Sequence, residues 1–435
     1  MKKRLILHIG VHRTGTTSIQ GWLHGNRKAL LGQGVRYAFD QRMHTDIAWQ
    51  LHTGKLSPGT LTERLLRDAA DDRVHTLILS GEDFCVLRDP SILSGLRDHF
   101  EVTVVCYLRR QDSWLESWYN QHVKWPWDRA LSQASAGEFI GQAEQFYWID
   151  YAWLLAGWRN AFGDDNLRIR VFEREQLTGS LEEDFAALCG IDAGQLGDPV
   201  AGSNDSAPPE AIEFLRHLKL IDKLGDERLV VVRTVVNIFR RNGLAHEKHF
   251  WPAKVRREYA AQFADSNKEV ATRYLGRADG APLFMAPLPG TDETPPRFQL
   301  PAVPALYDTI VNPVVRRLLW RVLSLQDQAA EHRRHGRGRP VTLVHRLKAH
   351  GQEWLSRLRG LTGRSTDLRL RSLMDLRALP LRQRQLLRQA LKAVNNDEIP
   401  NLDDPVDVTR RWVEPVISDL AARFHQARQA KQGQA

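Results

Sequence analysis

Cysteine is scarce in this sequence, and long hydrophobic runs are absent. The chain of 435 residues has three cysteines, Cys85, Cys106 and Cys189. They are far apart, and no two of them form a Cys-x-x-Cys pair. This excludes a disulfide framework and a cysteine-based zinc site, and it favours a reducing compartment. No stretch of about 18 apolar residues is present, so we expect no transmembrane segment.

The apolar run near the N-terminus also lacks the features of a signal peptide. Basic residues 2–4 precede residues 5–10, a short run that is interrupted by His8 and has no small-residue cleavage site after it. We therefore expect this run to form a buried first strand. The protein is expected to be soluble and cytoplasmic.

Positive charge is concentrated in the last third of the chain. The formal net charge is +9, with 24 Lys and Arg against 13 Asp and Glu in residues 301–435, and 37 against 39 in residues 1–300. This basic tail could contact an anionic surface or polymer, but it contains no clear nucleic-acid motif. The net charge therefore says little about chemistry in the N-terminal part.

Strand-like and helix-like segments alternate in the first half of the chain. Residues 77–79 and 102–105 are continuous, mainly apolar runs, as expected of strands buried on both faces. The predicted strands are residues 4–10, 75–80, 102–108 and 167–172, with 34–37 as a further candidate. The predicted helices are residues 16–31, 61–70, 113–124 and 180–188. This alternation predicts an α/β fold, in which helices flank a parallel sheet.

The rest of the chain is predicted to be mainly helical, with clear patterns at residues 209–220 and 260–274. Prolines cluster between Pro287 and Pro304 and indicate a linker. The predicted organisation is a first domain over 1–285, a Pro-rich linker over 286–306 and a basic helical accessory region over 307–435.

Two stretches of the accessory region, residues 341–358 and 381–393, are basic and amphipathic. Such helices could lie on anionic lipid or contact an anionic polymer. We favour an accessory domain that packs on the first domain and leaves an arginine-rich face in solvent.

The most informative segment joins the first strand to the first helix. It reads His8-Ile9-Gly10-Val11-His12-Arg13-Thr14-Gly15-Thr16-Thr17-Ser18. A glycine-containing turn before a helix that begins near Thr16 directs several backbone N–H groups and the positive helix end at one point. Thr16, Thr17 and Ser18 add hydroxyl donors. The pattern predicts a P-loop-like phosphate-binding loop, although a simple turn with a threonine-rich cap has the same pattern.

The cation of this loop differs from that of a nucleotide hydrolase. The hydrolase loop needs Lys directly after its second glycine, whereas Thr16 occupies that position and Arg13 lies inside the loop. Arginine provides planar, forked donors for phosphate oxygens. We expect Arg13 to reach the bridging oxygen between a phosphate and a transferring group, so that no metal is required.

A second element follows the predicted strand 102–108. Arg109 lies at the strand end, and Ser117 follows roughly two helical turns later. An arginine and a serine in these positions could hold one phosphate from two sides. Arg109 or Ser117 alone has a structural explanation, such as a strand-end arginine beside a capping Asp112. Both residues together, in this order, predict a second anion contact.

The two elements together resemble the PAPS-dependent sulfotransferase family, and its bacterial and carbohydrate-type branch in particular. PAPS is 3′-phosphoadenosine 5′-phosphosulfate. Residues 12–18 are similar to the family's 5′-phosphosulfate loop, and Arg109 with Ser117 is similar to its 3′-phosphate site. The resemblance covers roughly residues 1–285. Many members have Lys in place of Arg13, and the Arg-Lys-Gly loop of the small-molecule members is not visible here.

This resemblance implies transfer of a sulfuryl group from PAPS to an acceptor hydroxyl on a saccharide or glycoconjugate. It also implies a set of PAPS contacts, which are Arg13, Thr14, Gly15, Thr16, Thr17, Ser18, Arg109 and Ser117. Trp125 and Trp127, on either side of Pro126, could form a stacking platform for a sugar acceptor.

Two residues are candidates for the base that accepts the acceptor's proton. Glu82 follows the predicted strand 75–80, and the carboxyl ends of parallel strands are where α/β sites gather. His44 follows the candidate strand 34–37, where carbohydrate-type members can carry their base. Glu82 could instead cap a turn, and His44 could be a core histidine. We rank Glu82 first.

Two rival functions remain open. A P-loop nucleotide kinase or hydrolase would need the missing lysine and an acidic magnesium site. A non-catalytic nucleotide-binding protein would retain the nucleotide site without transferring a sulfuryl group.

Overall fold

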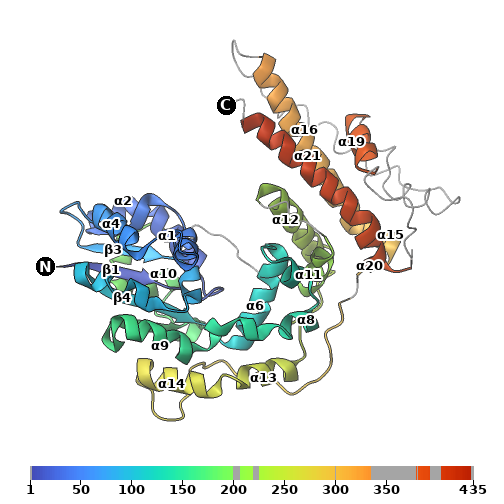
Figure 1. The fold of residues 1–435 in the computed structure, drawn as a ribbon. Helices are drawn as coiled ribbons and strands as arrows, with labels where there is room; N and C mark the ends of the chain where they lie inside the picture. The colour runs from blue at the N-terminus through green and yellow to red at the C-terminus, as the bar shows by residue number, and fades with distance from the viewer. Residues whose placement is uncertain are drawn as a thin grey trace. The chain divides into compact units, whose positions relative to one another are not determined.

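A parallel sheet of five strands organises the N-terminal half of the protein (Figure 1). The computed structural model describes residues 2–198, 206–218, 225–298, 300–334, 379, 381–391 and 403–432. The strands are β1 (Lys3–His8), β2 (Val35–Tyr37), β3 (Thr76–Ser80), β4 (Phe100–Leu108) and β5 (Leu167–Val171), in the order β2-β3-β1-β4-β5. Every pairing is parallel. The predicted α/β fold is confirmed, and each predicted strand is present with its ends moved by one or two residues.

Helices and short helical turns connect these strands. The helices are α1 (Thr16–Gly25), α2 (Arg27–Gly32), α3 (Thr45–His52), α4 (Pro58–Asp68), α5 (Leu96–His99), α6 (Gln111–Lys124), α9 (Tyr151–Phe162) and α10 (Leu181–Cys189). A 3₁₀ segment, η2 (Glu82–Val86), follows β3. The predicted helix 16–31 is two helices, because the chain leaves helical geometry at Asn26.

Local capping chemistry sets the ends of some helices, such as α9 and α10. Helix α10 begins with a complete capping box between Ser180 and Glu183 and ends at Gly190, whose φ of 71° is left-handed. The side chain of Asp150 accepts a hydrogen bond from the Trp153 amide at the start of α9. Helix α1 lacks such a side-chain cap, so the helix after the predicted phosphate loop differs from these two.

Both faces of the sheet are covered by helices. Ile6, Ile78 and Tyr107 pack on one face in a buried cluster with Ile19 of α1 and Phe185 of α10. Figure 1 shows α9 on the opposite side of the sheet from α1 and α2. Burial on both faces explains the nearly continuous apolar runs of the central strands.

The chain divides into two compact units, and the division differs from the predicted domain boundaries. Unit 1 contains Met1–Trp118, Ile140–Asp205 and Trp251–Pro295, and unit 2 contains Tyr119–Phe139, Ser206–Phe250 and Pro296–Ala435. Two segments that we predicted within the first domain, Tyr119–Phe139 and Ser206–Phe250, therefore pack in unit 2. Sequence order alone could not reveal this, because unit 1 is completed by the later helices α13 (Ala253–Ala261) and α14 (Ala264–Leu275).

Unit 2 is helical in the part that the structure describes. Its helices are α7 (Arg129–Gln133), α11 (Pro209–Arg216), α12 (Asp226–Arg241), α15 (Val303–Leu306), α16 (Asn312–Arg334), α19 (Leu381–Leu391), α20 (Pro405–Val408) and α21 (Glu414–Gln432), and α8 (Ala136–Ile140) ends at its boundary. Helices α16 and α21 lie side by side (Figure 1) and bury Leu318 and Val322 on α16, with Ile417 and Leu420 on α21. The predicted helical C-terminal region is confirmed, but the stretch 341–358 lies outside the described residues.

The N-terminal part of the predicted linker is docked on unit 1. Arg110 donates hydrogen bonds to the carbonyl oxygens of Ala286 and Pro287, both at 2.8 Å, and Arg257 donates to that of Pro289 at 3.0 Å. Proline has no backbone N–H, so this Pro-rich segment does not form a regular helix or strand. Its carbonyl oxygens therefore have no helix or sheet partner, and they accept hydrogen bonds from arginine side chains.

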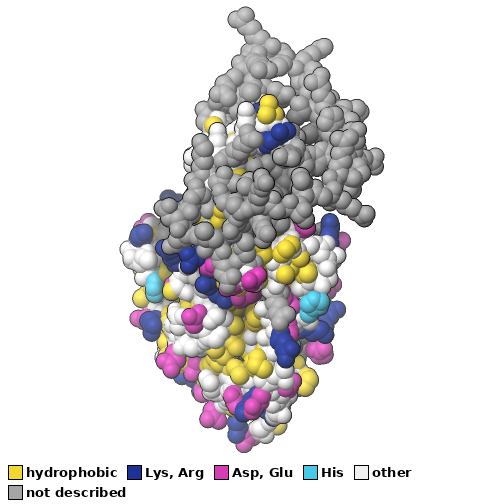
Figure 2. Space-filling model, turned by 90° about the vertical axis from the view of Figure 1, so that its right-hand side faces the viewer, with side chains coloured by type: hydrophobic (Ala, Val, Ile, Leu, Met, Phe, Trp, Pro, Cys, Tyr) yellow, Lys and Arg dark blue, Asp and Glu magenta, His cyan; other side chains and the backbone are white. Residues whose placement is uncertain are grey.

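The described surface carries charges of both signs. On the face shown in Figure 2, basic and acidic side chains are interspersed rather than segregated. Among the described residues, no helix combines the length and the apolarity needed to cross a membrane.

Candidate functional site

The predicted phosphate loop connects β1 to α1 through three residues with positive φ. These are Gly10 at 27°, Arg13 at 69° and Gly15 at 80°. A Cβ atom at Gly15 would lie 2.2 Å from the Leu181 side chain, and one at Gly10 would lie 2.6 Å from Thr16 Oγ1. A larger residue at either position would require these side chains to move. Arg13 adopts a left-handed conformation that costs energy for a residue with a Cβ atom.

Helix α1 presents backbone donors at its first turn. The amides of Ser18 and Ile19 donate to the Gly15 carbonyl, at 2.9 and 3.2 Å. Within the described residues, no side chain caps the helix and the amides of Thr16 and Thr17 have no acceptor. The Thr16 hydroxyl is also buried without a partner in this part of the chain. Such a helix start, with its positive dipole end, is suited to an anion.

This loop lies where the connections of the sheet reverse direction. Strand β1 lies between β3 and β4, and the chain after β1 leads toward β2, whereas the chain after β4 leads toward β5 at the other edge. The crevice outside the carboxyl ends of two such strands is the usual ligand site of an open α/β sheet. Arg109 directly follows β4, so the two predicted motifs lie next to each other at the carboxyl edge of the sheet.

The two motifs are in direct contact. Arg13 Nε donates to Ser117 Oγ at 2.7 Å, and Arg109 Nη1 donates to the carbonyl oxygen of Arg13 at 3.0 Å. The structure therefore brings together Arg13, Arg109 and Ser117, which lie up to 104 residues apart in the chain. Ser117 itself is buried.

Two guanidinium groups share this partly buried region. Burial lowers the pKa of Arg13, and the neighbouring Glu82 opposes that effect. Burial, and secondly repulsion by Arg13, lower the pKa of Arg109 to about 10. Arg109 still carries its charge at neutral pH. Bringing two cations together out of water is costly unless an anion compensates them.

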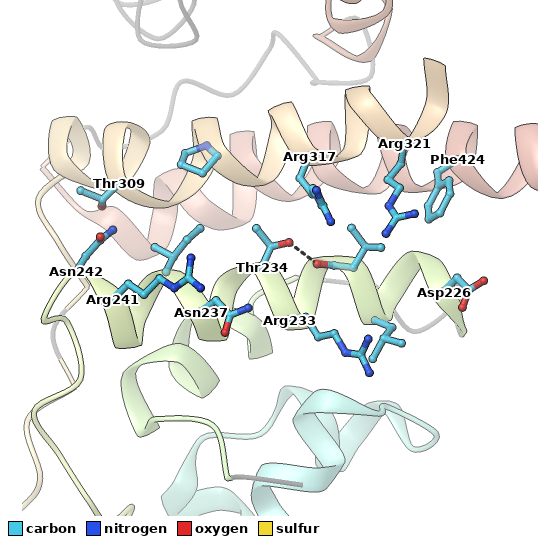
Figure 3. A pocket seen from close by; sticks show the side chains of 14 residues that line it. Asp226, Arg233, Thr234, Asn237, Arg241, Asn242, Thr309, Arg317, Arg321 and Phe424 are labelled. Atoms are coloured by element: carbon cyan, nitrogen blue, oxygen red, sulfur yellow. Dashed lines mark hydrogen bonds between the residues drawn. The ribbon is translucent and has the colours of Figure 1, made fainter. Parts of the chain in front are cut away.

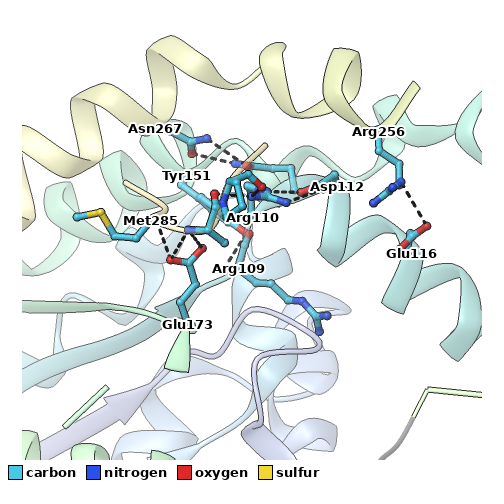
Figure 4. Close-up of polar contacts among 12 residues, drawn as sticks. Arg109, Arg110, Asp112, Glu116, Tyr151, Glu173, Arg256, Asn267 and Met285 are labelled. Carbon is cyan, nitrogen blue, oxygen red and sulfur yellow. Dashed lines mark hydrogen bonds and ion pairs between the residues drawn. The ribbon is translucent and has the colours of Figure 1, made fainter. Parts of the chain in front are cut away.

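The backbone around Arg109 is fixed by neighbours that leave its side chain extended. The Tyr151 hydroxyl accepts from the Arg109 amide at 3.3 Å and donates to the Arg109 carbonyl at 2.5 Å. Arg110 pairs with Asp112 at 2.7 Å. Figure 4 shows the Arg109 guanidinium pointing away from that pair. Within the described residues, the Arg13 carbonyl is its one hydrogen-bond acceptor.

Glu82 lies at the carboxyl end of β3, as predicted, and its carboxylate is half-buried. Burial raises the pKa of the Glu82 carboxyl above its ordinary value, while the nearby His12 and Arg13 lower it and Asp83 adds to the rise. Among the described residues, none donates a hydrogen bond to this carboxylate. Glu82 is therefore a carboxylate close to Arg13 that keeps its capacity to accept a proton.

His44, the second predicted base, is fully buried with both ring nitrogens in use. Its Nε2 pairs with the Ala38 carbonyl at 2.8 Å, and its Nδ1 accepts from the Ser80 amide at 3.1 Å. Burial lowers its pKa, which favours the neutral ring. The geometry assigns His44 a structural role, because neither nitrogen is left for a substrate proton.

Two of the predicted loop hydroxyls are committed to protein partners. Thr14 Oγ1 donates to the Val11 carbonyl at 2.5 Å, and Ser18 Oγ donates to Glu182 at 2.5 Å. Thr17 is half-buried, and no described residue pairs with its side chain. The hydroxyls that remain for a ligand are therefore those of Thr16 and Thr17, rather than the whole predicted set.

A buried His12–Asp83 pair was not predicted. His12 Nε2 lies 2.6 Å from an Asp83 oxygen, and the Cys85 sulfur lies 3.5 Å from His12 Nδ1. Burial alone would lower the pKa of His12, but Cys85 and Asp83 raise it well above the ordinary value. The ring also packs on Trp118, with centroids 4.5 Å apart. The His12–Asp83 contact thus links the loop to the segment that carries Glu82.

The tryptophans are mainly packing residues. Trp114, Trp118 and Trp148 form a buried cluster in unit 1, with the first two rings stacked at 5.4 Å. Trp127, in unit 2, is 51% exposed, and Trp125 is half-buried. Of the two predicted platform residues, only Trp127 therefore presents much of its ring to solvent.

Comparison with known proteins gives one similarity and no functional information. The chain is 29% identical to an uncharacterized protein of Archaeoglobus fulgidus over 205 residues, which are 46% of this chain and 54% of that protein. The chain thus spans about half the length of this curated relative. No family model and no solved structure matches the chain.

Proposed function

We propose that the protein is a sulfotransferase that moves a sulfuryl group from PAPS to an acceptor hydroxyl. The observation that carries the proposal is the contact between the two motifs, in which Arg13 donates to Ser117 and Arg109 donates to the Arg13 carbonyl. A donor with phosphates at both its 5′ and 3′ positions needs two anion contacts near each other, and the residues that follow β1 and β4 could supply both.

In this proposal each group of residues has one task. The first amides of α1, with the hydroxyls of Thr16 and Thr17, bind the 5′-phosphate. The Arg109 guanidinium and the Ser117 hydroxyl donate hydrogen bonds to the 3′-phosphate. Arg13 neutralises the negative charge that develops on the bridging oxygen as the bond between sulfur and that oxygen breaks.

The acceptor oxygen forms the new bond to sulfur and must lose its proton. We assign that proton to Glu82, whose raised pKa brings it closer to the neutral range in which a general base is most effective. The proton passes from the acceptor hydroxyl to the Glu82 carboxylate, and the 5′-phosphate leaves with the electron pair of the broken bond. The saccharide or glycoconjugate nature of the acceptor follows from the family resemblance.

The rival kinase or hydrolase function finds less support in the loop. Thr16, rather than Lys, begins α1. We further propose a reducing, cytoplasmic location, which suits three buried, free cysteine thiols.

The test is direct binding of PAP, the desulfated donor, against ADP and against ATP with magnesium. Isothermal titration on the wild type should show tighter binding of PAP than of ADP, because only PAP carries the 3′-phosphate. Arg109→Ala should weaken PAP binding by about 10- to 100-fold, the loss expected for a charge-assisted contact, and should leave ADP binding nearly unchanged.

A matched control is Arg168→Ala, which removes an exposed arginine on β5 whose side chain donates only to backbone carbonyls among the described residues. It should bind PAP like the wild type. Equal affinity for PAP and ADP would overturn the sulfotransferase proposal. PAP binding without transfer to any phenol, lipid or saccharide would instead indicate a non-catalytic nucleotide-binding protein.

A further inference from the structure

Unit 2 contains a pocket that none of the predicted functions uses. It has a volume of about 640 Å³ and is lined by residues of α12, of α16 with the turn before it, and by Phe424 of α21. Figure 3 shows α12 and α16 on opposite sides of the pocket, with Asn242 and Thr309 at one end and Asp226 near the other. Its size is within the range of roughly 300–1000 Å³ that is usual for small-ligand sites.

Four arginines line this pocket, two from each helix. Arg233 and Arg241 belong to α12, and Arg317 and Arg321 belong to α16. None of the four forms an ion pair within the described part of the chain. Asp226, the acidic residue among the described lining residues, is paired with Arg428 at 2.8 Å. The pocket therefore has an excess of positive charge that its own walls do not neutralise.

The arginines of α16 are held in place by an aromatic ring. The guanidinium carbons of Arg317 and Arg321 lie 5.2 and 5.3 Å from the centre of the Trp320 ring. Figure 3 shows both side chains directed toward α12. Stacking of this kind orders two otherwise flexible side chains and so reduces the entropy that binding would cost.

Neutral hydrogen-bonding groups alternate with the charges. Along α12, Asn237 lies between Arg233 and Arg241 at intervals of four residues, which is roughly 6 Å of helix. Asn242 and Thr309 add further polar groups at one end. A ligand that lies along the pocket would thus meet alternating sites for an oxyanion and for a hydroxyl.

We propose that this pocket, the arginine groove, binds a short acidic oligosaccharide, a chain of sugar hydroxyls that also bears sulfate or carboxylate groups. The groove is concave, whereas a bilayer surface is flat and favours a convex helix face with exposed apolar residues. Among the described residues, its only aromatic lining residue is Phe424, which is 4% exposed, so this lining offers no platform on which nucleic-acid bases stack. This inference is independent of the sulfotransferase proposal.

The test compares two double variants of the full chain that remove the same charge from the same two helices. Arg241→Gln with Arg317→Gln changes the groove. Arg240→Gln with Arg316→Gln changes the neighbouring residues, which do not line the pocket. The probes are a heparin-derived tetrasaccharide, neutral maltotetraose, phosphatidylglycerol vesicles and a short oligothymidylate, and thermal melts establish that both variants fold.

The wild type and the Arg240/Arg316 variant should bind the heparin tetrasaccharide alike, and the groove variant should bind it about tenfold more weakly. Maltotetraose should bind far more weakly than the acidic probe. Equal losses in the two variants would overturn the proposal, because binding would then follow net charge alone. Absence of tetrasaccharide binding, or tighter groove-dependent binding of the vesicles or the oligothymidylate, would also overturn it. PAP affinity reports separately on the site in unit 1.

Discussion

The loop site of unit 1 and the arginine groove of unit 2 hold positive charge in physically different ways. In the loop site, Arg13 and Arg109 are partly buried, and each donates a hydrogen bond that fixes its position. In the groove, Arg233, Arg241 and Arg317 are exposed, and Arg321 is half-buried. Burial strengthens electrostatic interactions because less water screens them. The loop site is therefore suited to chemistry, and the groove to reversible binding.

The largest expected effect is the loss of Arg13. Arg13→Ala should lower kcat by about 100- to 1000-fold, the range seen when one donor to a developing negative charge is removed. The KM for PAPS should change much less, because in intact PAPS this charge on the bridging oxygen has not yet developed. Steady-state kinetics with PAPS would measure both quantities.

Arg13→Lys provides the control, because it keeps a positive charge but removes the guanidinium group that also donates to Ser117. It should recover part of the lost rate. An increase in the KM for PAPS with kcat unchanged in Arg13→Ala would mean that Arg13 serves binding alone, and the contrast between a catalytic and a binding arginine region would then fail.

The second prediction concerns the acidic residue beside each arginine region. Asp226 in the groove is ion-paired, whereas Glu82 has no hydrogen-bond donor among the described residues and has a raised pKa. A base works only when deprotonated, so the wild-type rate should fall as the pH decreases through this raised pKa. Glu82→Gln should lower the rate about 100-fold and abolish the acidic limb of the pH profile. An acidic limb that persists in Glu82→Gln would assign the base to another group.

How much could be predicted from the sequence depended on the range of the interactions. The strands, the glycine turn and the start of α1 follow from residues close together in the chain, and their prediction was correct. The pairing of His12 with Asp83 depends on β1 and β3 being neighbours, and strand order has no local signal. His44 was an open candidate for the same reason, since its backbone partners Ala38 and Ser80 become visible only in three dimensions.

The same limit applies to the loop hydroxyls and to the groove. Ser18 was predicted to bind phosphate, but its hydroxyl donates to Glu182, 164 residues away. The groove arginines are separated by the Pro-rich segment, so their common orientation depends on how α12 and α16 pack. Periodicity predicts that a segment is helical, but it does not identify the partner of its polar face.

The third prediction tests whether anion binding at the loop site depends on a rigid backbone. We expect no such dependence for binding in the exposed groove. Gly15 and Gly54 both have positive φ, of 80° and 68°, but a Cβ atom at Gly15 would meet Leu181 at 2.2 Å, whereas one at Gly54 would meet no atom within 4 Å. Gly54→Ala should cost about 1 kcal/mol of folding stability from backbone strain alone. Gly15→Ala should cost about 2–4 kcal/mol, because overpacking adds to that strain.

Thermal melts of the two alanine variants would measure this difference, and PAP titrations would show whether the loop still binds an anion. Gly15→Ala should weaken PAP binding while leaving the groove's affinity for the acidic tetrasaccharide unchanged. Similar melting temperatures for the two variants would indicate that the loop can shift to relieve the contact with Leu181.

The smallest expected effect is the salt dependence that separates the two regions. The Debye length is about 10 Å at 0.1 M salt, and screening acts most strongly on exposed charges. Raising the salt from about 50 to about 200 mM should weaken tetrasaccharide binding to the groove about tenfold, and PAP binding less than about threefold. PAP also carries several charges, so its smaller response would reflect the burial of Arg13 and Arg109 rather than a smaller ligand charge. Equal slopes of log Kd against log salt would mean that water screens both sites alike, and the distinction drawn from burial would fail.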